Sequence, residues 1–286
     1  MSTLAYTRTG AGEPVVLLHG IGMARGVWDP VIPALAARFD VIAVDLPGFG
    51  ESLAPAEALT PARLAAAVAE LLDDLAVTMP HLVGNSLGGW TALELAALVP
   101  AASVTLLSPA GFWRKHTPLY CRVSLRASRW LARRLGRPLA RLVSWRLGRV
   151  LVLGQTHGRP TKVPADVARR TVREMGTCPG FESALRATAR TRYVPPAPIA
   201  CPVTVAFGSR DWLLRPRQSR HLDQLPAGCS AEILPRCGHV PMADDPFAVA
   251  AFIAAGIAAT ASAIDAASQP ISARRPTRGA ALRPGR

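Results

Sequence analysis

The 286-residue sequence lacks the features of a membrane or secreted protein. No run of about 18 residues is free of charged and turn-forming side chains, so no membrane-spanning helix is predicted. The Ala-rich stretch at 247–267 comes closest, but Gly256 and Asp265 interrupt it, and we interpret it as a packed C-terminal helix. The first residues show no basic segment followed by an apolar one. We therefore expect no signal peptide and a cytoplasmic location.

Paired cysteines are also missing. The five cysteines are odd in number and irregularly spaced, and none forms a C-x-x-C pair. This usage is typical of buried thiols in a reducing compartment rather than of a disulfide framework or a zinc site. We expect neither a metal ion nor a cofactor.

Lysine is scarce, and acidic residues are absent from two segments. Lys115 and Lys162 are the only lysines, and the net charge of +14 comes from arginine. Residues 113–165 contain eleven Arg, two Lys and no acid, and residues 268–286 contain five Arg and no acid. The rest of the chain is slightly acidic. Because no nucleic-acid-binding motif accompanies the charge, a nucleic-acid partner is not predicted.

Short apolar runs alternate with helical patterns in two parts of the chain. The apolar runs lie at 15–19, 41–44, 81–85, 103–108, 203–207 and 230–234, and the helical patterns near 27–37, 60–77, 87–98, 216–224 and 245–260. Short runs rich in Val and Ile are typical of strands that are buried on both faces. The alternation therefore predicts an α/β fold with a doubly wound, mostly parallel sheet.

The alternation stops between about residues 111 and 198, where helical patterns predominate. We predict one domain at 1–267, with a core formed by 1–111 and 199–267 and a helical lid at 112–198. The lid is expected over the carboxyl edge of the sheet. The basic segment 268–286 is predicted to be a disordered tail.

The segment HLVGNSLGGW, residues 81–90, predicts a strained strand-to-helix turn around Ser86. Side chains two positions before and after the serine would collide in such a turn, which explains Gly84 and Gly88. The helix that follows directs its first amides at the space above the serine, so the Leu87 N–H can hold an oxyanion.

A second glycine-rich turn, LLHGIG at 17–22, follows another predicted strand. Its Gly20 and Gly22 allow a backbone N–H, that of Ile21, to reach the same oxyanion. His19 sits at the end of the strand, where we expect it to hold this loop by hydrogen bonding rather than to act as a base.

A serine hydroxyl needs a base, and the base needs an orienting carboxylate. His239 follows the last predicted strand and directly precedes the final helix, and Asp211 lies four residues beyond a strand end. We predict Ser86, Asp211 and His239 as a catalytic triad. Asp244 and Asp245 are expected to cap the final helix, and His157 to have only a surface or packing role.

The chain from about residue 5 to 257 resembles the α/β-hydrolase superfamily, in its lidded, single-domain branch. The motifs that carry the resemblance are LLHGIG, DLPGFGES at 45–52, GNSLGG at 84–89, GSRD at 208–211 and GHVPM at 238–242. The resemblance implies the α/β-hydrolase fold, with the lid inserted after the sixth strand, and a Ser-His-Asp triad. About 14 residues precede VVLLHG, so the first strands are shortened or one is missing.

The resemblance leaves the reaction open. Ser rather than Asp at position 86 argues against haloalkane dehalogenases and epoxide hydrolases. Asn85 is similar to carbon–carbon bond hydrolases of aromatic degradation, whereas Val240 after the histidine is similar to many esterases and lipase-like members. A carboxylic ester hydrolase is the first expectation. The alternatives are a carbon–carbon bond hydrolase, a non-catalytic ligand-binding member of the fold, and an acyl transferase.

The predicted lid contains a stripe of arginines interleaved with large apolar residues. Arginine recurs at 122, 126, 129, 133, 137 and 141, and the apolar residues are Leu119, Val123, Trp130, Leu131, Leu135, Leu139 and Leu142. We expect the apolar face to roof the site and the substrate to carry an apolar acyl or aromatic part. The basic face is either a solvated surface or a contact for an anionic membrane or substrate. The oligomeric state is not predicted.

Overall fold

The computed structural model describes residues 4–226, 229 and 231–268, and the side chains as far as residue 259. The predicted tail lies outside the described residues, apart from Ser268 at the end of the last helix. None of the helices in the described ranges is long and apolar enough to cross a bilayer.

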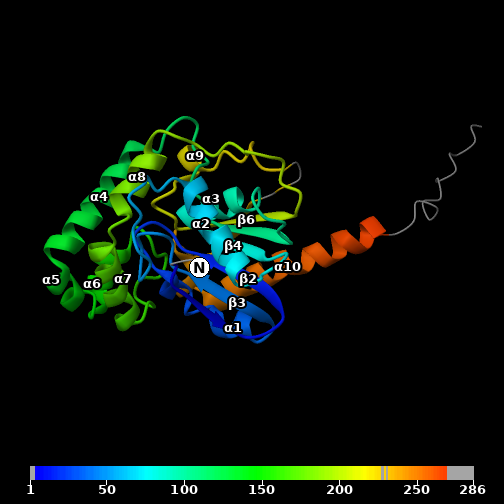
Figure 1. Cartoon of the computed structure of the whole chain (residues 1–286). Coiled ribbons are helices and arrows are strands. Elements are labelled where there is room, and N and C mark those ends of the chain that lie inside the picture. Colours follow the sequence, from blue (N-terminus) through cyan, green and yellow to red (C-terminus); the bar gives the residue numbers. More distant parts are fainter. Residues whose placement is uncertain (1–3, 227–228, 230, 269–286) are drawn as a thin grey trace, which may run out of the picture.

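One sheet of seven strands organises the described part of the chain (Figure 1). The order is β1-β3-β2-β4-β5-β6-β7, in which β1 is antiparallel to β3 and all other neighbours are parallel. The strands are β1 (Tyr6–Thr9), β2 (Glu13–Leu18), β3 (Phe39–Val44), β4 (His81–Asn85), β5 (Ser103–Leu107), β6 (Val203–Gly208) and β7 (Ala231–Leu234). The predicted doubly wound α/β fold is confirmed, and six of these strands match the six apolar runs.

The strands are apolar throughout because helices cover both faces of the sheet. Side chains alternate between faces along a strand, so Val16 and Leu18 join the core under α2 (Pro61–Asp74) and α3 (Leu87–Leu95). Val15 and Leu17 join the core under α1 (Ile32–Ala36) and α10 (Pro246–Ser268). All four side chains are fully buried. The predicted N-terminus of α2 is confirmed, since the Thr60 hydroxyl accepts from the Arg63 N–H at 3.2 Å.

The segment between β5 and β6 forms a group of helices at one end of the molecule (Figure 1). These are α4 (Leu119–Arg134), α5 (Gly136–Leu142), α6 (Arg146–Leu153), α7 (Ala165–Thr177) and α8 (Phe181–Ala189). They enclose a small apolar core of their own, which includes Val143, Leu153 and Val172. Helix α4 packs against α7, and α5 packs against both.

Several predicted boundaries were wrong. The insert follows the fifth strand of the described chain and not the sixth, because β1 alone precedes β2. The predicted helix at 27–37 is divided into a 3₁₀ turn, Arg25–Trp28, and α1, since Pro30 and Pro33 cannot donate backbone hydrogen bonds. The helix predicted at 216–224 is only α9 (Pro216–Ser219).

Candidate active site

Ser86 occupies the sharp turn between β4 and α3. Its φ of 55° and ψ of −115° lie in a region that non-glycine residues rarely adopt, which costs on the order of 1–3 kcal/mol. A Cβ on Gly84 would lie 2.2 Å from the Gly88 carbonyl oxygen, and one on Gly88 would lie 2.1 Å from that of Leu18. The Ser86 carbonyl accepts from the Ala110 N–H at 2.9 Å, so the surrounding backbone holds the turn in place.

Asp211 and His239 come together from two different loops at the carboxyl edge of the sheet. The His239 Nδ1 and the Asp211 Oδ2 are 3.0 Å apart, and both side chains are buried. Burial by itself raises the pKa of Asp211, but the charge and the hydrogen bond of His239 outweigh it, and the pKa lies below its ordinary value. The carboxylate also accepts from the backbone N–H groups of Leu213 at 3.0 Å and Leu214 at 2.7 Å. The pair is therefore arranged with an ionised Asp211.

Asn85 connects the histidine loop to the serine turn. Its side-chain amide donates to the backbone carbonyl oxygens of His239 and Leu107, both at 2.9 Å. The structure shows no hydrogen bond between Ser86 and His239, a bond that often tightens only when substrate binds. Asn85 thus links the histidine loop to the end of β5 through two hydrogen bonds.

The loop after β2 lies directly beside the serine. A Cβ on Gly20 would be 3.2 Å from the Ser86 Cβ, and Gly22 has a φ of 76°, with the Met175 side chain of α7 against it. The amides of Ile21 and Leu87 donate no hydrogen bond to any residue that the structure describes, and both residues line the cavity at Ser86. Two unpaired donors at this place suit an oxyanion.

His19 holds this loop, as its position in the sequence suggested. Its Nε2 accepts from the Leu46 N–H at 3.0 Å, so its Nδ1 carries the proton and donates to the Gly20 carbonyl at 2.8 Å. Burial lowers the pKa of His19. Both ring nitrogens are occupied, and the ring is neutral, so it is not available as a base.

Two residues at the site were missed by sequence reasoning. Ser108, at the end of β5 with a φ of 45°, contributes to lowering the pKa of Asp211. Asp244 does not cap the last helix, because its carboxylate accepts from the amides of Gly158 and Arg159 at 2.7 Å and of Gly238 at 2.8 Å.

Asp244 therefore fastens the lid segment after α6 to the loop that carries His239. Asp245, by contrast, does cap α10, since its carboxylate accepts from the Ala248 N–H at 3.2 Å. His157 lies in the fastened segment, where it is buried, and its Nδ1 is 3.0 Å from the Thr156 hydroxyl. Nothing in the sequence indicates that Asp244 contacts a segment more than 80 positions away.

Above Ser86 is a small cavity of about 30 Å³. Its walls are mainly apolar, with Trp113 and Leu213 from the connecting segments and Leu125 and Leu185 from lid helices α4 and α8. This volume has room for about one water molecule. Leu125 of α4 and Leu185 of α8 thus leave little room above the serine.

The face of α4 that roofs the cavity was predicted incorrectly. Cys121 and Leu125 point inward, whereas Leu119, Val123 and Trp130 are 66%, 56% and 59% exposed. Positions two apart on an α-helix are separated by about 200°, so these two sets lie on opposite faces.

Among the described residues, no three His, Cys, Asp or Glu side chains are grouped as metal ligands would be.

Comparison with known proteins agrees with this architecture. The model of the alpha/beta hydrolase family matches residues 15–252, which is most of the chain. The chain belongs to the alpha/beta hydrolase family.

Within this family, the relatives have different activities. An epoxide hydrolase, EphH, of Mycobacterium tuberculosis is 33% identical over 66% of this chain and 90% of its own length. A pimeloyl-[acyl-carrier protein] methyl ester esterase of Aeromonas hydrophila is 39% identical over 38% of this chain and 41% of its own. A solved bacterial membrane phospholipase A is 27% identical with a TM-score of 0.70, over 90% of this chain and 83% of its own. The chain spans less than half the length of the first curated relatives it matches.

Proposed function

We propose that the chain is a serine hydrolase that cleaves a carboxylic ester or a related acyl bond. The observation that carries the proposal is the buried contact of 3.0 Å between His239 and Asp211, beside a strained Ser86. A strained serine backbone at the end of a parallel strand lowers the stability of the fold. A buried imidazole–carboxylate pair beside it supports a role of this serine as a nucleophile. Two unpaired amides at the same cavity complete the set of groups that acyl transfer requires.

In the proposed mechanism, the Ser86 hydroxyl attacks the carbonyl carbon while the His239 Nε2 takes its proton. Asp211 accepts from the Nδ1–H of the imidazole and stabilises the imidazolium that forms. The amides of Leu87 and Ile21 donate to the oxyanion. The tetrahedral intermediate collapses as His239 returns the proton to the leaving alcohol, which departs. Water then attacks the acyl-enzyme by the same steps and releases the acid.

The substrate is proposed to carry an apolar acyl or aromatic part, because the cavity at Ser86 is lined mainly by apolar side chains. A volume of about 30 Å³ is smaller than such a group, so the proposal includes a movement of the lid that admits it. Serine rather than a carboxylate at position 86 favours an ester over an epoxide, although an epoxide hydrolase is among the relatives.

A panel of p-nitrophenyl esters, from acetate to decanoate, tests the proposal on wild type and Ser86→Ala. Wild type should hydrolyse the esters, with kcat/KM rising with acyl length, and Ser86→Ala should lose on the order of 10³-fold or more. Strong preference for acetate would contradict the apolar substrate. Turnover of no ester by a folded wild type would contradict ester hydrolysis and favour a carbon–carbon bond hydrolase or a binding protein. An added alcohol acceptor separates hydrolysis from acyl transfer.

A further inference from the structure

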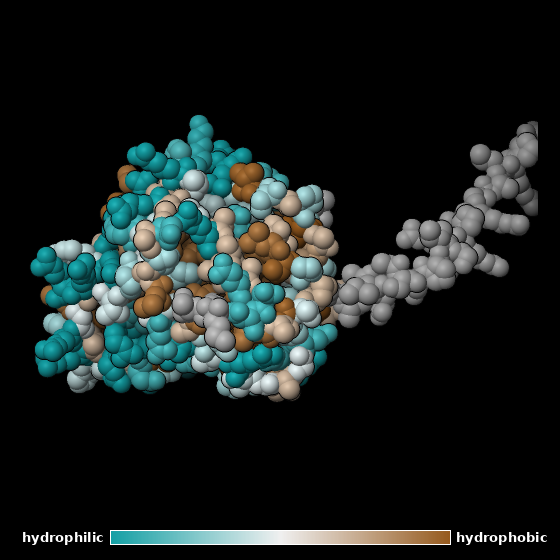
Figure 2. Space-filling model, in the orientation of Figure 1, coloured by the Kyte–Doolittle hydropathy of each residue, from teal (hydrophilic) through white to brown (hydrophobic). Residues whose placement is uncertain are grey.

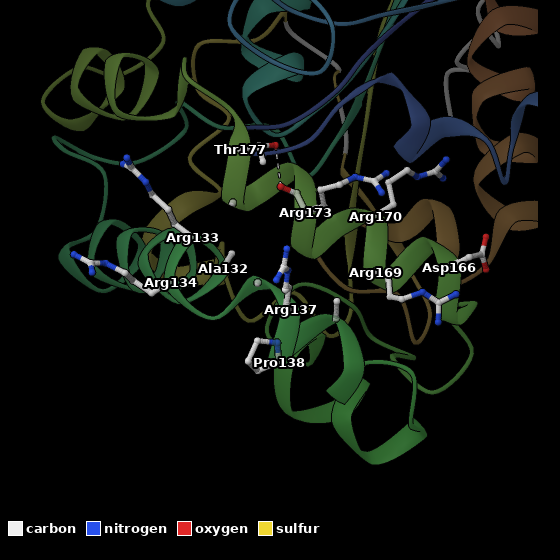
Figure 3. Close-up of a pocket in the computed structure, with 13 residues that line it drawn as sticks. Ala132, Arg133, Arg134, Arg137, Pro138, Asp166, Arg169, Arg170, Arg173 and Thr177 are labelled. Atoms are coloured by element: carbon white, nitrogen blue, oxygen red, sulfur yellow. Dashed lines mark hydrogen bonds between the residues drawn. The ribbon is translucent and has the colours of Figure 1, made fainter.

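A second cavity lies in the lid and shares no lining residue with the cavity at Ser86. It has a volume of about 880 Å³ and lies between the carboxyl end of α4, the start of α5 and the length of α7 (Figure 3). Six arginines line it, and Asp166 is the one acidic residue among the lining residues. We call it the arginine pocket. Its arginines are Arg133, Arg134, Arg137, Arg169, Arg170 and Arg173.

The charges of this pocket are only partly compensated. Arg170 is held by Asp29 at 2.6 Å, and Arg169 donates to the Ser144 hydroxyl at 3.0 Å. The guanidinium groups of Arg133, Arg137 and Arg173 make no hydrogen bond or ion pair with any residue in the described ranges. Figure 3 shows the Arg137 side chain extending from α5 into the space toward α7.

Arginines that line one concave site repel each other electrostatically. The segment 113–165 contains no acidic residue that could relieve this repulsion. Figure 2 shows that hydrophilic side chains cover most of the lid in that view. An anion in the pocket would remove the repulsion and satisfy donors that have no partner.

The backbone leaves room for such an anion. A Cβ built on Gly136 would find no atom within 4 Å, so the first residue of α5 opens onto free space. On the facing helix, a Cβ on Gly176 would lie 3.0 Å from the Ala132 carbonyl oxygen, which shows how closely α7 approaches α4. The pocket is therefore bordered by two glycines and lined by six arginines, of which Arg137 extends into the space while Arg133 and Arg134 extend away from α7 (Figure 3).

We propose that the arginine pocket binds a phosphate-bearing anion, as a phosphorylated small molecule or as a phospholipid headgroup. Guanidinium groups form paired hydrogen bonds with phosphate oxygens, and arginines from two helices suit an anion with several oxygens. The volume exceeds that of inorganic phosphate, so an organic group fits beside it. The bound anion lies against α4, the helix whose other end roofs Ser86. This inference does not depend on the proposed ester hydrolysis.

Titration calorimetry of the full chain with glycerol 3-phosphate, against glycerol at equal ionic strength, tests the soluble source. Arg137→Gln/Arg173→Gln should bind at least about tenfold more weakly than wild type, because both lost donors are charged. The matched control is Arg141→Gln/Arg146→Gln, which removes the same charge from exposed arginines outside the pocket. Its affinity should stay within about twofold of wild type.

Gly136→Phe fills the pocket without changing its charge and should also weaken binding. In phosphate-free buffer, Arg137→Gln/Arg173→Gln should unfold at no lower temperature than wild type, because it loses repulsion and no ion pair. A folded variant that still loses binding therefore reports on the site itself.

Sedimentation with vesicles of phosphatidylglycerol and phosphatidylcholine, against phosphatidylcholine alone, tests the lipid source. Trp130 is 59% exposed and lies in an adjoining hollow that also contains Arg133. If the ligand is a lipid, Trp130→Ala should weaken vesicle binding and leave glycerol 3-phosphate binding unchanged. If vesicle binding depends on Arg137 and Arg173 and glycerol 3-phosphate does not bind, the ligand is the phospholipid headgroup. The proposal is overturned if no probe binds, or if the control variant loses as much affinity as the pocket variant.

Discussion

Replacing Asp244 with alanine removes a buried carboxylate that joins the lid to the histidine loop. Three backbone amides, of Gly158, Arg159 and Gly238, donate to it over 2.7–2.8 Å, and the residue is only 3% exposed. A buried donor that loses its acceptor costs about 1–3 kcal/mol. Allowing for water that enters, Asp244→Ala should lower the free energy of unfolding by on the order of 4 kcal/mol.

Asp245→Ala is the matched control, because it removes the same side chain from the next position. Asp245 caps α10 through one amide and forms a partly exposed ion pair with Arg159 at 3.3 Å, so its loss should cost about 1–2 kcal/mol. Urea unfolding of both variants measures the difference, and amide hydrogen exchange locates it. Protection of the Gly158 and Gly238 amides should fall in Asp244→Ala and persist in Asp245→Ala. Equal costs for the two variants, or unchanged exchange at both glycines, would refute the assignment of Asp244 as the connection.

Three further predictions follow from individual contacts. Burial raises the pKa of Glu174 to about 7. The protonated side chain is therefore tolerated below its ordinary pKa, and the stability of the protein falls as the pH rises toward 7 and the carboxyl ionises. In urea unfolding, wild type should lose on the order of 3 kcal/mol relative to Glu174→Gln between pH 4.5 and 7. Gly88→Ala brings a Cβ to 2.1 Å from the Leu18 carbonyl oxygen and should prevent folding or destabilise the protein by several kcal/mol. Gly136→Ala should be neutral or slightly stabilising, and thermal unfolding measures both variants. Asn85→Ala releases the His239 carbonyl and should lower kcat about tenfold or more with little change in KM; an unchanged kcat would show that its hydrogen bond does not position the base.

The sequence was most informative where the constraint is local. The strained Ser86 needs glycine at 84 and 88 because atoms a few residues apart would otherwise overlap, and that requirement is visible in the sequence. The buried strands were visible for the same reason, since each run of Val, Ile and Leu faces a core on both sides.

Contacts between residues that are far apart along the chain leave no comparable signal in the sequence. Asp244 and Asp245 are adjacent aspartates, and only the folded chain shows that Asp244 accepts from buried amides more than 80 residues away while Asp245 caps a helix. The buried face of α4 was misassigned because apolar residues occur all around this helix. Leu119 and Val123 have the same spacing as Cys121 and Leu125, so periodicity alone could not choose between the two faces.

The central claim is that Ser86 is an activated nucleophile. Purified wild type and Ser86→Ala, both shown to be folded, should be treated with a fluorophosphonate in a detergent that promotes opening of the lid, and the intact proteins weighed. The account predicts one adduct on wild type and none on Ser86→Ala. An adduct on both proteins, or on neither, would contradict it.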